Sequence, residues 1–501
     1  MDNYSEKIKQ LNEDLEEIIL SLIKKFKQLN TPIKIYTHLD ADGLSAGAII
    51  GKALYREDLP FQITVLKQLE REQIAEIALQ TKNGEDFIIF SDFGSGQYKE
   101  LRKKLSTPFF ILDHHLPQGV SSKDKLEQLD EIYMETKQWH INPYFYGFDG
   151  STEVSGAGMC YLFAKNMNDA NIDLSTIALV GATGDVQNQG PNKSFTGINA
   201  EIVEDAKNEE LIQMVNDLNF STLKPLNQAI AYSTEIKLPG LNGDENKSLK
   251  FLKKLNVSVE NPDGSLKTLM DLTQEEKQKI TSGLVEYASL KLDIEPYEIL
   301  DKLIVNRILL INEEKESNLF DIGEFSNLLN ACGRMNNASV GIATAMGNRD
   351  KSYQKAQKNL KDYKKSLMDA ISWIKEENVI QEKEYIQYYY GDDKISDNIV
   401  GTVASILIFD ESEAIKLNKP LFGYANRERE DAYKISARAH KKLVKKGVNL
   451  SEAIREALKL SNLEALGGGH PPAAGTKVPT GKINLFLDNV NTVIGNQLKN
   501  T

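Results

Sequence analysis

Four short apolar runs in the first quarter of the chain restrict the fold more than any other feature. The runs KIYT, FQITVL, DFIIF and PFFIL begin at residues 34, 61, 86 and 108. Each is long enough for one strand, and the charged stretches between them have the composition of helices. This alternation predicts an α/β fold in which helices cover the faces of a parallel sheet.

Acids and histidines follow three of these runs, KIYT, DFIIF and PFFIL, where they end. A further apolar segment, STIALVGATG, is also followed by an acid, and we treat it as one more strand end. Because parallel strands present their carboxyl ends at one edge of a sheet, the sequence predicts that these segments converge on one crevice. For any one acid, a helix cap or a turn is the ordinary alternative. The residues concerned are His38, Asp40, Asp42, Asp92, Asp113, His114, His115 and Asp185.

Carboxylates and imidazoles in this number suit two divalent cations. Oxygen ligands favour Mg²⁺ or Mn²⁺, nitrogen ligands favour later transition metals, and Mn²⁺ accepts both. Two ions about 4 Å apart would hold the attacking and leaving oxygens of a phosphoryl transfer. The sequence therefore predicts a dinuclear centre that prefers Mn²⁺, with Mg²⁺ as the alternative.

Composition and charge narrow the class of protein. Hydrophobic residues make up 41% and charged residues 26%, as in soluble globular proteins. The longest uncharged apolar stretch, residues 399–409, is too short to span a bilayer, so we expect no membrane partner. The two cysteines lie far apart, which fits a reducing cytoplasm. A net charge of −12 argues against a basic coat but allows a local basic groove.

The pattern of periodicity and turns predicts four parts of the chain. Residues 1–30 form an N-terminal helix, and residues 31–215 form the metal-binding catalytic domain. A connecting or insertion region with a linker helix follows at 216–380 and contains the fragment NACGR. Residues 381–501 return to an α/β pattern and form a second α/β domain.

Several motifs, taken in order, resemble one known superfamily. The fragments HLDADG, SDFGSG, ILDHHLP and GATGD resemble the four successive motifs of the DHH phosphoesterases, and GGGHPPAAG resembles the signature of the accompanying DHHA1 domain. HINPYFYG, SGAG and NACGRM resemble the archaeal RecJ-like branch, which includes GINS-associated nucleases. The resemblance implies a parallel-sheet DHH domain plus a smaller α/β DHHA1 domain across a cleft.

The resemblance also implies roles for the residues at matching positions. One metal ion would be held by His38 and Asp40, with Asp92 bridging to the second ion. Asp113 would orient His114, and His115 would stabilise charge at the scissile phosphate. Related bacterial nucleases often carry an aspartate at the position of His38. The implied ligands of the second ion are Asp42, His114 and Asp185.

Further residues would hold the substrate. Arg334 in NACGRM can form a forked contact with a phosphate, and its ordinary alternative is a salt bridge. Arg438 begins a basic run that is either a wall of a nucleic-acid channel or a solvated helix face. The implied phosphate contacts of the glycine-rich signature are Gly468, Gly469 and His470.

The resemblance implies an exonuclease that acts on single-stranded DNA or RNA and releases nucleoside monophosphates by a two-metal mechanism, in DNA replication or repair. One alternative is a phosphodiesterase for oligoribonucleotides or cyclic dinucleotides. Another is a replisome scaffold, because some relatives have lost their metal ligands, and this adds the GINS complex as a candidate partner. Every implied ligand position in this chain holds a residue able to bind metal.

Overall fold

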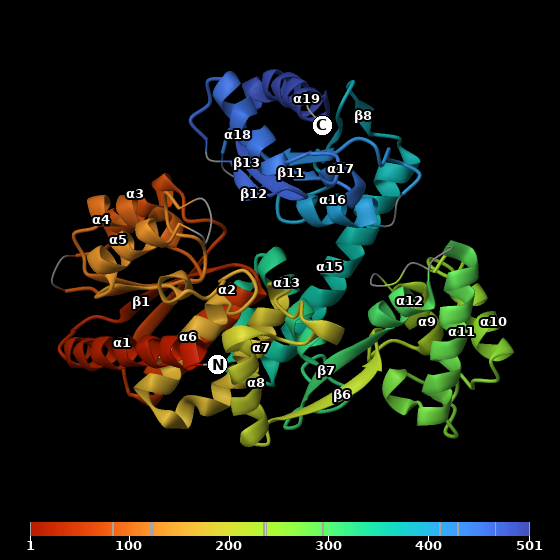
Figure 1. Ribbon diagram of the computed structural model, residues 1–501, viewed down its shortest axis with the longest axis horizontal. Helices are drawn as coiled ribbons and strands as arrows, with labels where there is room; N and C mark the ends of the chain where they lie inside the picture. The colour runs from red at the N-terminus through yellow and green to blue at the C-terminus, as the bar shows by residue number, and fades with distance from the viewer. Residues whose placement is uncertain are drawn as a thin grey trace. The chain divides into compact units, whose positions relative to one another are not determined.

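The computed structural model describes residues 2–82, 85–120, 125–233, 236, 238–292, 295–409, 412–427, 430–465 and 467–499. The chain divides into two compact units, Met1–Leu360 and Lys361–Thr501, which are coloured red to green and green to blue in Figure 1. Each unit has its own sheet, so each is described by itself.

A five-stranded parallel sheet forms the centre of the first unit, in the order β2-β1-β3-β4-β5. All four predicted strands are present in it. His140 lies in the short edge strand β5. The strands are β1 (Ile33–His38), β2 (Phe61–Leu66), β3 (Ile88–Ser91), β4 (Phe109–Leu112) and β5 (His140–Ile141).

Helices cover both faces of this sheet, as Figure 1 shows. On one face, Phe90 packs in a core with residues of α3 (Arg71–Gln80), α4 (Tyr98–Lys104) and α5 (Leu126–Thr136). On the other face, the ring of Phe110 lies 5.7 Å from that of Phe163. The helices of this second face are α2 (Ala41–Arg56) and α6 (Gly156–Met167), and α1 (Asp2–Phe26) packs against α6.

One element differs from its predicted form. The segment STIALVGATG was treated as a strand end, but it is the helix α7 (Ser175–Gly184), which packs against α2, α6 and α8 (Gly197–Asn208). Most of its residues are buried, and a helix enclosed by other helices is apolar all round, so its periodicity cannot be told from that of a buried strand. Asp185 therefore follows a helix.

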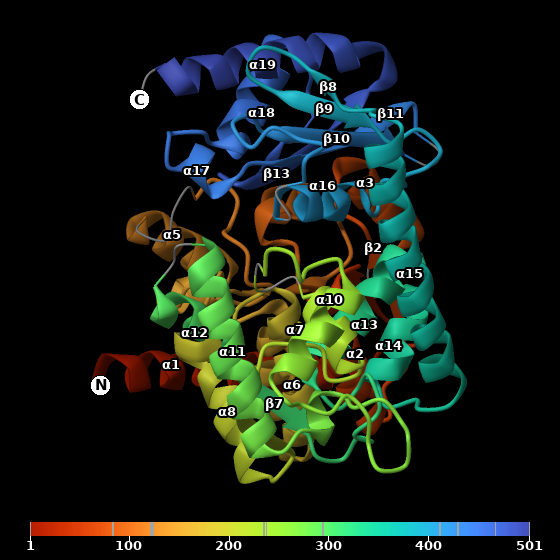
Figure 2. The same cartoon turned by 90° about the vertical axis from the view of Figure 1, so that its right-hand side faces the viewer.

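A helical module interrupts the first unit. It leaves from β6 (Ile212–Leu218) and returns through β7 (Ile304–Leu310), which lie side by side in Figure 1. These antiparallel strands pair so that Leu218 lies opposite Ile304. Figure 2 shows the module, in yellow-green to green, from another side. From the sequence, this region is predicted to be a connection or an insertion, and it has a core of its own. We call residues 219–303 the insertion. Its helices are α9 (Leu226–Ala231), α10 (Glu245–Lys254), α11 (Gln274–Leu292) and α12 (Pro296–Leu303).

Three helices follow β7. The first, α13 (Ile322–Arg334), packs against α2, α7 and α14 (Ala338–Ala345). The third, α15 (Lys351–Glu376), runs from the first unit into the second. Among the described helices, none is both long and apolar enough to cross a membrane.

The second unit is built on a six-stranded mixed sheet in the order β12-β13-β11-β10-β9-β8. Residues of α16 (Val400–Phe409) pack on one face, and residues of α18 (Leu450–Leu460) and α19 (Ile483–Lys499) pack on the other. A short helix, α17 (Lys441–Val444), precedes α18. The strands are β8 (Gln381–Glu382), β9 (Gln387–Tyr390), β10 (Leu421–Asn426), β11 (Ala432–Arg438), β12 (Gly468–His470) and β13 (Ala473–Pro479).

The predicted fold class is confirmed: a parallel-sheet α/β domain is accompanied by a smaller α/β unit. The domain limits at 30, 215 and 380 stay predictions.

The insertion should lose stability independently of the parallel sheet. Leu284 on α11 is fully buried in its core, whereas Leu290 on the same helix is 79% exposed. We expect L284A to cost about 2–5 kcal/mol through the cavity that it leaves. Hydrogen exchange should then accelerate within residues 219–303 and stay unchanged in β1, β3 and β4, and L290A is the matched control. Equal acceleration in the sheet would contradict a separate core.

Candidate metal centre

The ends of β1, β3 and β4 deliver acids and histidines to one place. Asp40 caps α2, where its Oδ1 accepts the Gly43 N–H at 3.0 Å. Asp92 leaves β3 with a φ of 61°, a left-handed conformation that aspartate tolerates better than most residues. Its own N–H donates to the Leu112 carbonyl at 2.9 Å, which fixes the turn against β4.

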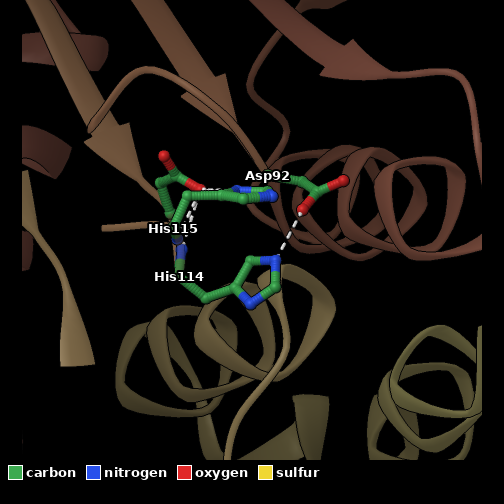
Figure 3. A group of neighbouring side chains, drawn as sticks. Asp92, His114 and His115 are labelled. Atoms are coloured by element: carbon green, nitrogen blue, oxygen red, sulfur yellow. Dashed lines mark hydrogen bonds and ion pairs between the residues drawn. The ribbon is translucent and has the colours of Figure 1, made fainter. Parts of the chain in front are cut away.

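The structure brings all the predicted metal-binding side chains together, in overlapping groups able to hold an ion. The ligand atoms within each group lie within 4.8 Å of one another. Figure 3 shows the rings of His114 and His115 with the carboxylate of Asp92. The groups are His38, Asp40 and Asp92; Asp42, His114 and Asp185; and Asp92, Asp113, His114 and His115.

Asp92 lies between the first two groups. Its Oδ1 is 3.2 Å from His114 Nε2, and its Oδ2 is 3.7 Å from His38 Nδ1. His114 Nε2 is also 3.3 Å from Asp185 Oδ2 and 3.7 Å from Asp42 Oδ2. His38 Nδ1 is 2.8 Å from Asp40 Oδ2. The two oxygens of Asp92 thus face different histidines, as a bridging carboxylate requires.

Within the part of the chain that the structure describes, two atoms at this centre are buried without a hydrogen-bond partner. They are Asp92 Oδ1 and His114 Nε2, which face each other. Buried polar atoms are normally hydrogen-bonded, so an unpaired acceptor and an unpaired ring nitrogen that face each other need an explanation. A cation between them would satisfy both, and the residues present fit divalent metal ions in their number and chemistry.

The protonation of the centre reflects crowded negative charge. Burial, together with the charges of Asp42 and Asp40, raises the pKa of Asp92 well above its usual range. Burial and Asp42 also raise the pKa of Asp185 to about 7. Burial lowers the pKa of His114, but Asp185 and Asp42 outweigh it and raise that pKa to about 8. Without a cation, protons are retained to relieve this repulsion, and bound metal would release them.

The ring of His114 is oriented by a backbone carbonyl. Its Nδ1 lies 2.6 Å from the Gly150 oxygen, which can only accept, so Nδ1 carries the proton and Nε2 is left for a metal. A Cβ on Gly150 would lie 1.9 Å from the His114 carbonyl oxygen, so only glycine fits there. Gln187 Nε2 donates to the same Gly150 oxygen at 2.9 Å, and its Oε1 accepts from Asn199.

Asp113 organises the backbone of the triplet. Its Oδ1 accepts the N–H groups of His114 and His115 at 2.8 and 3.2 Å, and its Oδ2 accepts the Ser95 N–H at 2.8 Å. The side chain that it orients is His115, whose Nδ1 lies 2.8 Å from Oδ1. The sequence analysis expected Asp113 to orient the ring of His114, a role that the Gly150 carbonyl takes. The His115 side chain is 57% exposed, with Nε2 left for other partners.

Asp42 is held by the start of α6. Its Oδ2 accepts the Gly156 N–H at 2.7 Å and its Oδ1 accepts the Ala157 N–H at 3.0 Å. These two N–H groups belong to the first turn of a helix, where they have no partner within the helix and favour a negative charge. Sequence reasoning missed the residues that hold these ligands, because their side-chain types do not indicate metal binding. Only their place in a motif could have identified them. They are Gly150, Gly156, Ala157 and Gln187.

The predicted phosphate contacts lie in two places. Arg334 ends α13. Burial alone would raise the pKa of Asp40, but His38 and, more weakly, Arg334 lower it below its usual range, so Arg334 belongs to the surroundings of the centre.

In the second unit, Arg438 Nε donates to Ser405 Oγ at 2.7 Å. Gly468, Gly469 and His470 are exposed and form β12, an edge strand, so among the described residues one side of their backbone has no strand beside it. Their predicted roles stay predictions.

Comparison with known proteins places the chain in a family. Residues 221–304 match the DHH-CID domain and residues 383–496 match the DHHA1 domain. An uncharacterized protein of Methanocaldococcus jannaschii is 30% identical over 487 residues, which cover 97% of this chain and 98% of that protein. The chain belongs to the DHH/DHHA1 superfamily. Members of this superfamily are phosphoesterases.

Solved structures share the fold of this superfamily member. Exonuclease RecJ bound to manganese aligns with a TM-score of 0.52 at 15% identity, covering 96% of this chain and 94% of that one. CDC45 from Entamoeba histolytica aligns with a TM-score of 0.63 at 12% identity, covering 97% and 99%. The DHH-CID match coincides with the insertion, and the DHHA1 match lies within the second unit.

The buried ring of His140 should make stability depend on pH. Thr136 Oγ1 donates its proton to the Ile132 carbonyl and so can only accept from His140 Nδ1, 3.5 Å away, which leaves His140 Nε2 unprotonated and able to accept from Ser95 Oγ at 2.7 Å. Burial lowers the pKa of His140 from 6.5 to about 4. The unfolded chain therefore binds the proton first, and stability falls as the pH drops from 6.5 towards 4, by about 3 kcal/mol in all.

Substitution of His140 tests this. The variant H140Q has no such proton to bind, so chemical denaturation should show a smaller loss of unfolding free energy between pH 7 and 4 than in the wild type. If the unfolding free energies of H140Q and the wild type fell in parallel as the pH is lowered, a neutral buried His140 would be contradicted.

Proposed function

We propose that this chain is a metal-dependent exonuclease that hydrolyses single-stranded DNA or RNA to nucleoside monophosphates, in the cytoplasm and in DNA replication or repair. The observation that carries the proposal is the convergence of His38, His114 and four carboxylates around the unpaired Asp92 Oδ1 and His114 Nε2. The fold shared with exonuclease RecJ bound to manganese supports it.

The residues divide into two ligand sets that share Asp92. His38 and Asp40 would hold one ion, and Asp42, His114 and Asp185 would hold the other, with Mn²⁺ preferred because it accepts both nitrogen and oxygen ligands. When bound, two divalent cations lower the pKa of a water and neutralise charge on a phosphoryl group.

The remaining side chains would act on the phosphate. His115 has its Nδ1 engaged by Asp113, so Nε2 of this exposed ring is the nitrogen that would contact a phosphate oxygen or the leaving oxygen. Arg334, beside Asp40, carries a permanent charge with the fork geometry that matches phosphate. In the second unit, the exposed backbone of β12 would supply N–H donors and His470 a side-chain contact.

Hydrolysis of labelled strands is the direct test. Single strands of DNA and RNA, labelled at either the 5′ or the 3′ end, are incubated with Mn²⁺, with Mg²⁺ or with a chelator. We expect stepwise release of mononucleotides with metal and none with chelator, and the label that is released first gives the polarity. Hydrolysis of a dinucleotide but not of a 20-mer would favour the small-substrate alternative.

Loss of Asp92 should abolish this activity. Substitution of residues that hydrogen-bond to metal ligands already lowers metal affinity or activity about 10- to 100-fold. Removal of the shared ligand itself in D92A should therefore lower metal-dependent turnover at least about 100-fold. D130A, which changes an exposed acid on α5, is the matched control. Near-normal turnover by D92A would exclude the two-metal assignment.

A scaffold in the replisome is the second candidate. The alignment with CDC45 over nearly the whole of both chains favours it. The complete set of metal-binding residues argues for catalysis. Co-elution with the GINS complex, from a protein that binds metal but cleaves no strand, would support the scaffold.

A further inference from the structure

The NACGR segment contacts the loop that carries His38 and Asp40. Asn330 on α13 accepts the Ala41 N–H at 3.1 Å through its Oδ1. Three residues later, a Cβ on Gly333 would lie only 1.8 Å from the Leu39 carbonyl oxygen, so glycine alone allows α13 this close to the loop. The segment therefore touches the loop through the side chain of Asn330 and the backbone at Gly333.

The contact from Asn330 satisfies a backbone group that the loop cannot satisfy itself. Ala41 is the first residue of α2, and the first N–H groups of a helix have no partner within the helix. Asp40 already uses its Oδ1 to cap Gly43, so Asn330 completes the helix start. With the N–H groups of Ala41 and Gly43 both bonded, the Asp40 carboxylate is held so that its Oδ2 faces His38 Nδ1.

The position of α13 is itself fixed at its other end. Asp321 caps α13 and pairs with Arg307 of β7, whose Nη2 lies 2.9 Å from Asp321 Oδ2. Both side chains are more than nine-tenths buried. Arg307 Nη1 also donates to the carbonyl oxygens of Leu218 and Phe220, where the insertion begins. One turn further along α13, Glu324 accepts from Ser221 Oγ at 2.5 Å.

We propose that α13 holds the first metal-ligand loop in place and fastens it to the base of the insertion, with Asn330 as the positioning residue. The inference rests on the proposed function, because the loop matters only if His38 and Asp40 hold an ion. Asn330 touches none of the reacting atoms. It acts on metal binding through the backbone of Ala41.

Metal binding tests the proposal without any nuclease assay. The full-length wild type, N330A, N330D and N327A are titrated with Mn²⁺ by calorimetry and by electron paramagnetic resonance, and H38A serves as a reference for a damaged first site. We expect N330A to lower the affinity for one of the two Mn²⁺ ions about 10- to 100-fold, the loss typical when a residue that supports a metal ligand is removed. N330A should also lose the resonance signal of two coupled ions, as we expect for H38A. N330D keeps an acceptor for the Ala41 N–H and should restore binding.

The controls separate positioning from general damage. Asn327 lies on the exposed face of the same helix, so N327A should bind both ions like the wild type. Thermal unfolding shows whether each variant is folded. Folded N330A that binds both ions with wild-type affinity, or N330D that binds no better than N330A, would overturn the proposal.

A wild-type chain that binds no Mn²⁺ would overturn the proposed function as well. Two ions bound by the wild type without cleavage of any strand would count against the nuclease and leave the role of Asn330 standing.

Discussion

Repulsion between buried carboxylates is the constraint on which the rest of the first unit depends. Asp42 and Asp92 are almost completely buried and, with Asp185, share His114 as a neighbour. Like charges in a medium of low dielectric repel strongly, and burial together with that repulsion raises the pKa values of Asp92 and Asp185. A fold tolerates such a cluster only where surrounding groups hold each carboxylate and cations balance the charge.

The surrounding groups are mostly backbone, and this explains the packing around the centre. The Asp42 carboxylate receives two N–H groups of α6, Asp113 receives three N–H groups from its own turn and from Ser95, and the His114 ring donates to a carbonyl. Some close approaches of the chain around the centre also require a residue without a Cβ. Gly150 and Gly333 lie at two such points, and at both a methyl group would overlap a carbonyl oxygen.

The sequence predicted the elements whose formation depends on residues that are close together in the chain. Strands β1 to β4 follow from short apolar runs, and the convergence of the residues after β1, β3 and β4 follows from the rule that parallel strands end at one edge. Asp185 follows a helix, so this rule does not explain its place. The helix α7 was missed because burial on all sides removes the polar face that reveals a helix. The partner of the His114 ring was missed because the Gly150 carbonyl lies 36 residues away in the chain and has no side chain. The core of the insertion depends on contacts between four helices that no periodicity displays.

The place of α13 after the insertion has a consequence for biosynthesis. All the predicted metal ligands are translated by residue 185, but Asn330 and Gly333 emerge only after the whole helical module has been made. The pairing of Leu218 with Ile304 closes that module, and β7 brings the chain back beside β6 just before α13 begins. On the ribosome, the nascent chain therefore carries the predicted ligands long before it carries the helix that contacts their loop, so α13 can add its contacts only after the whole module has been translated.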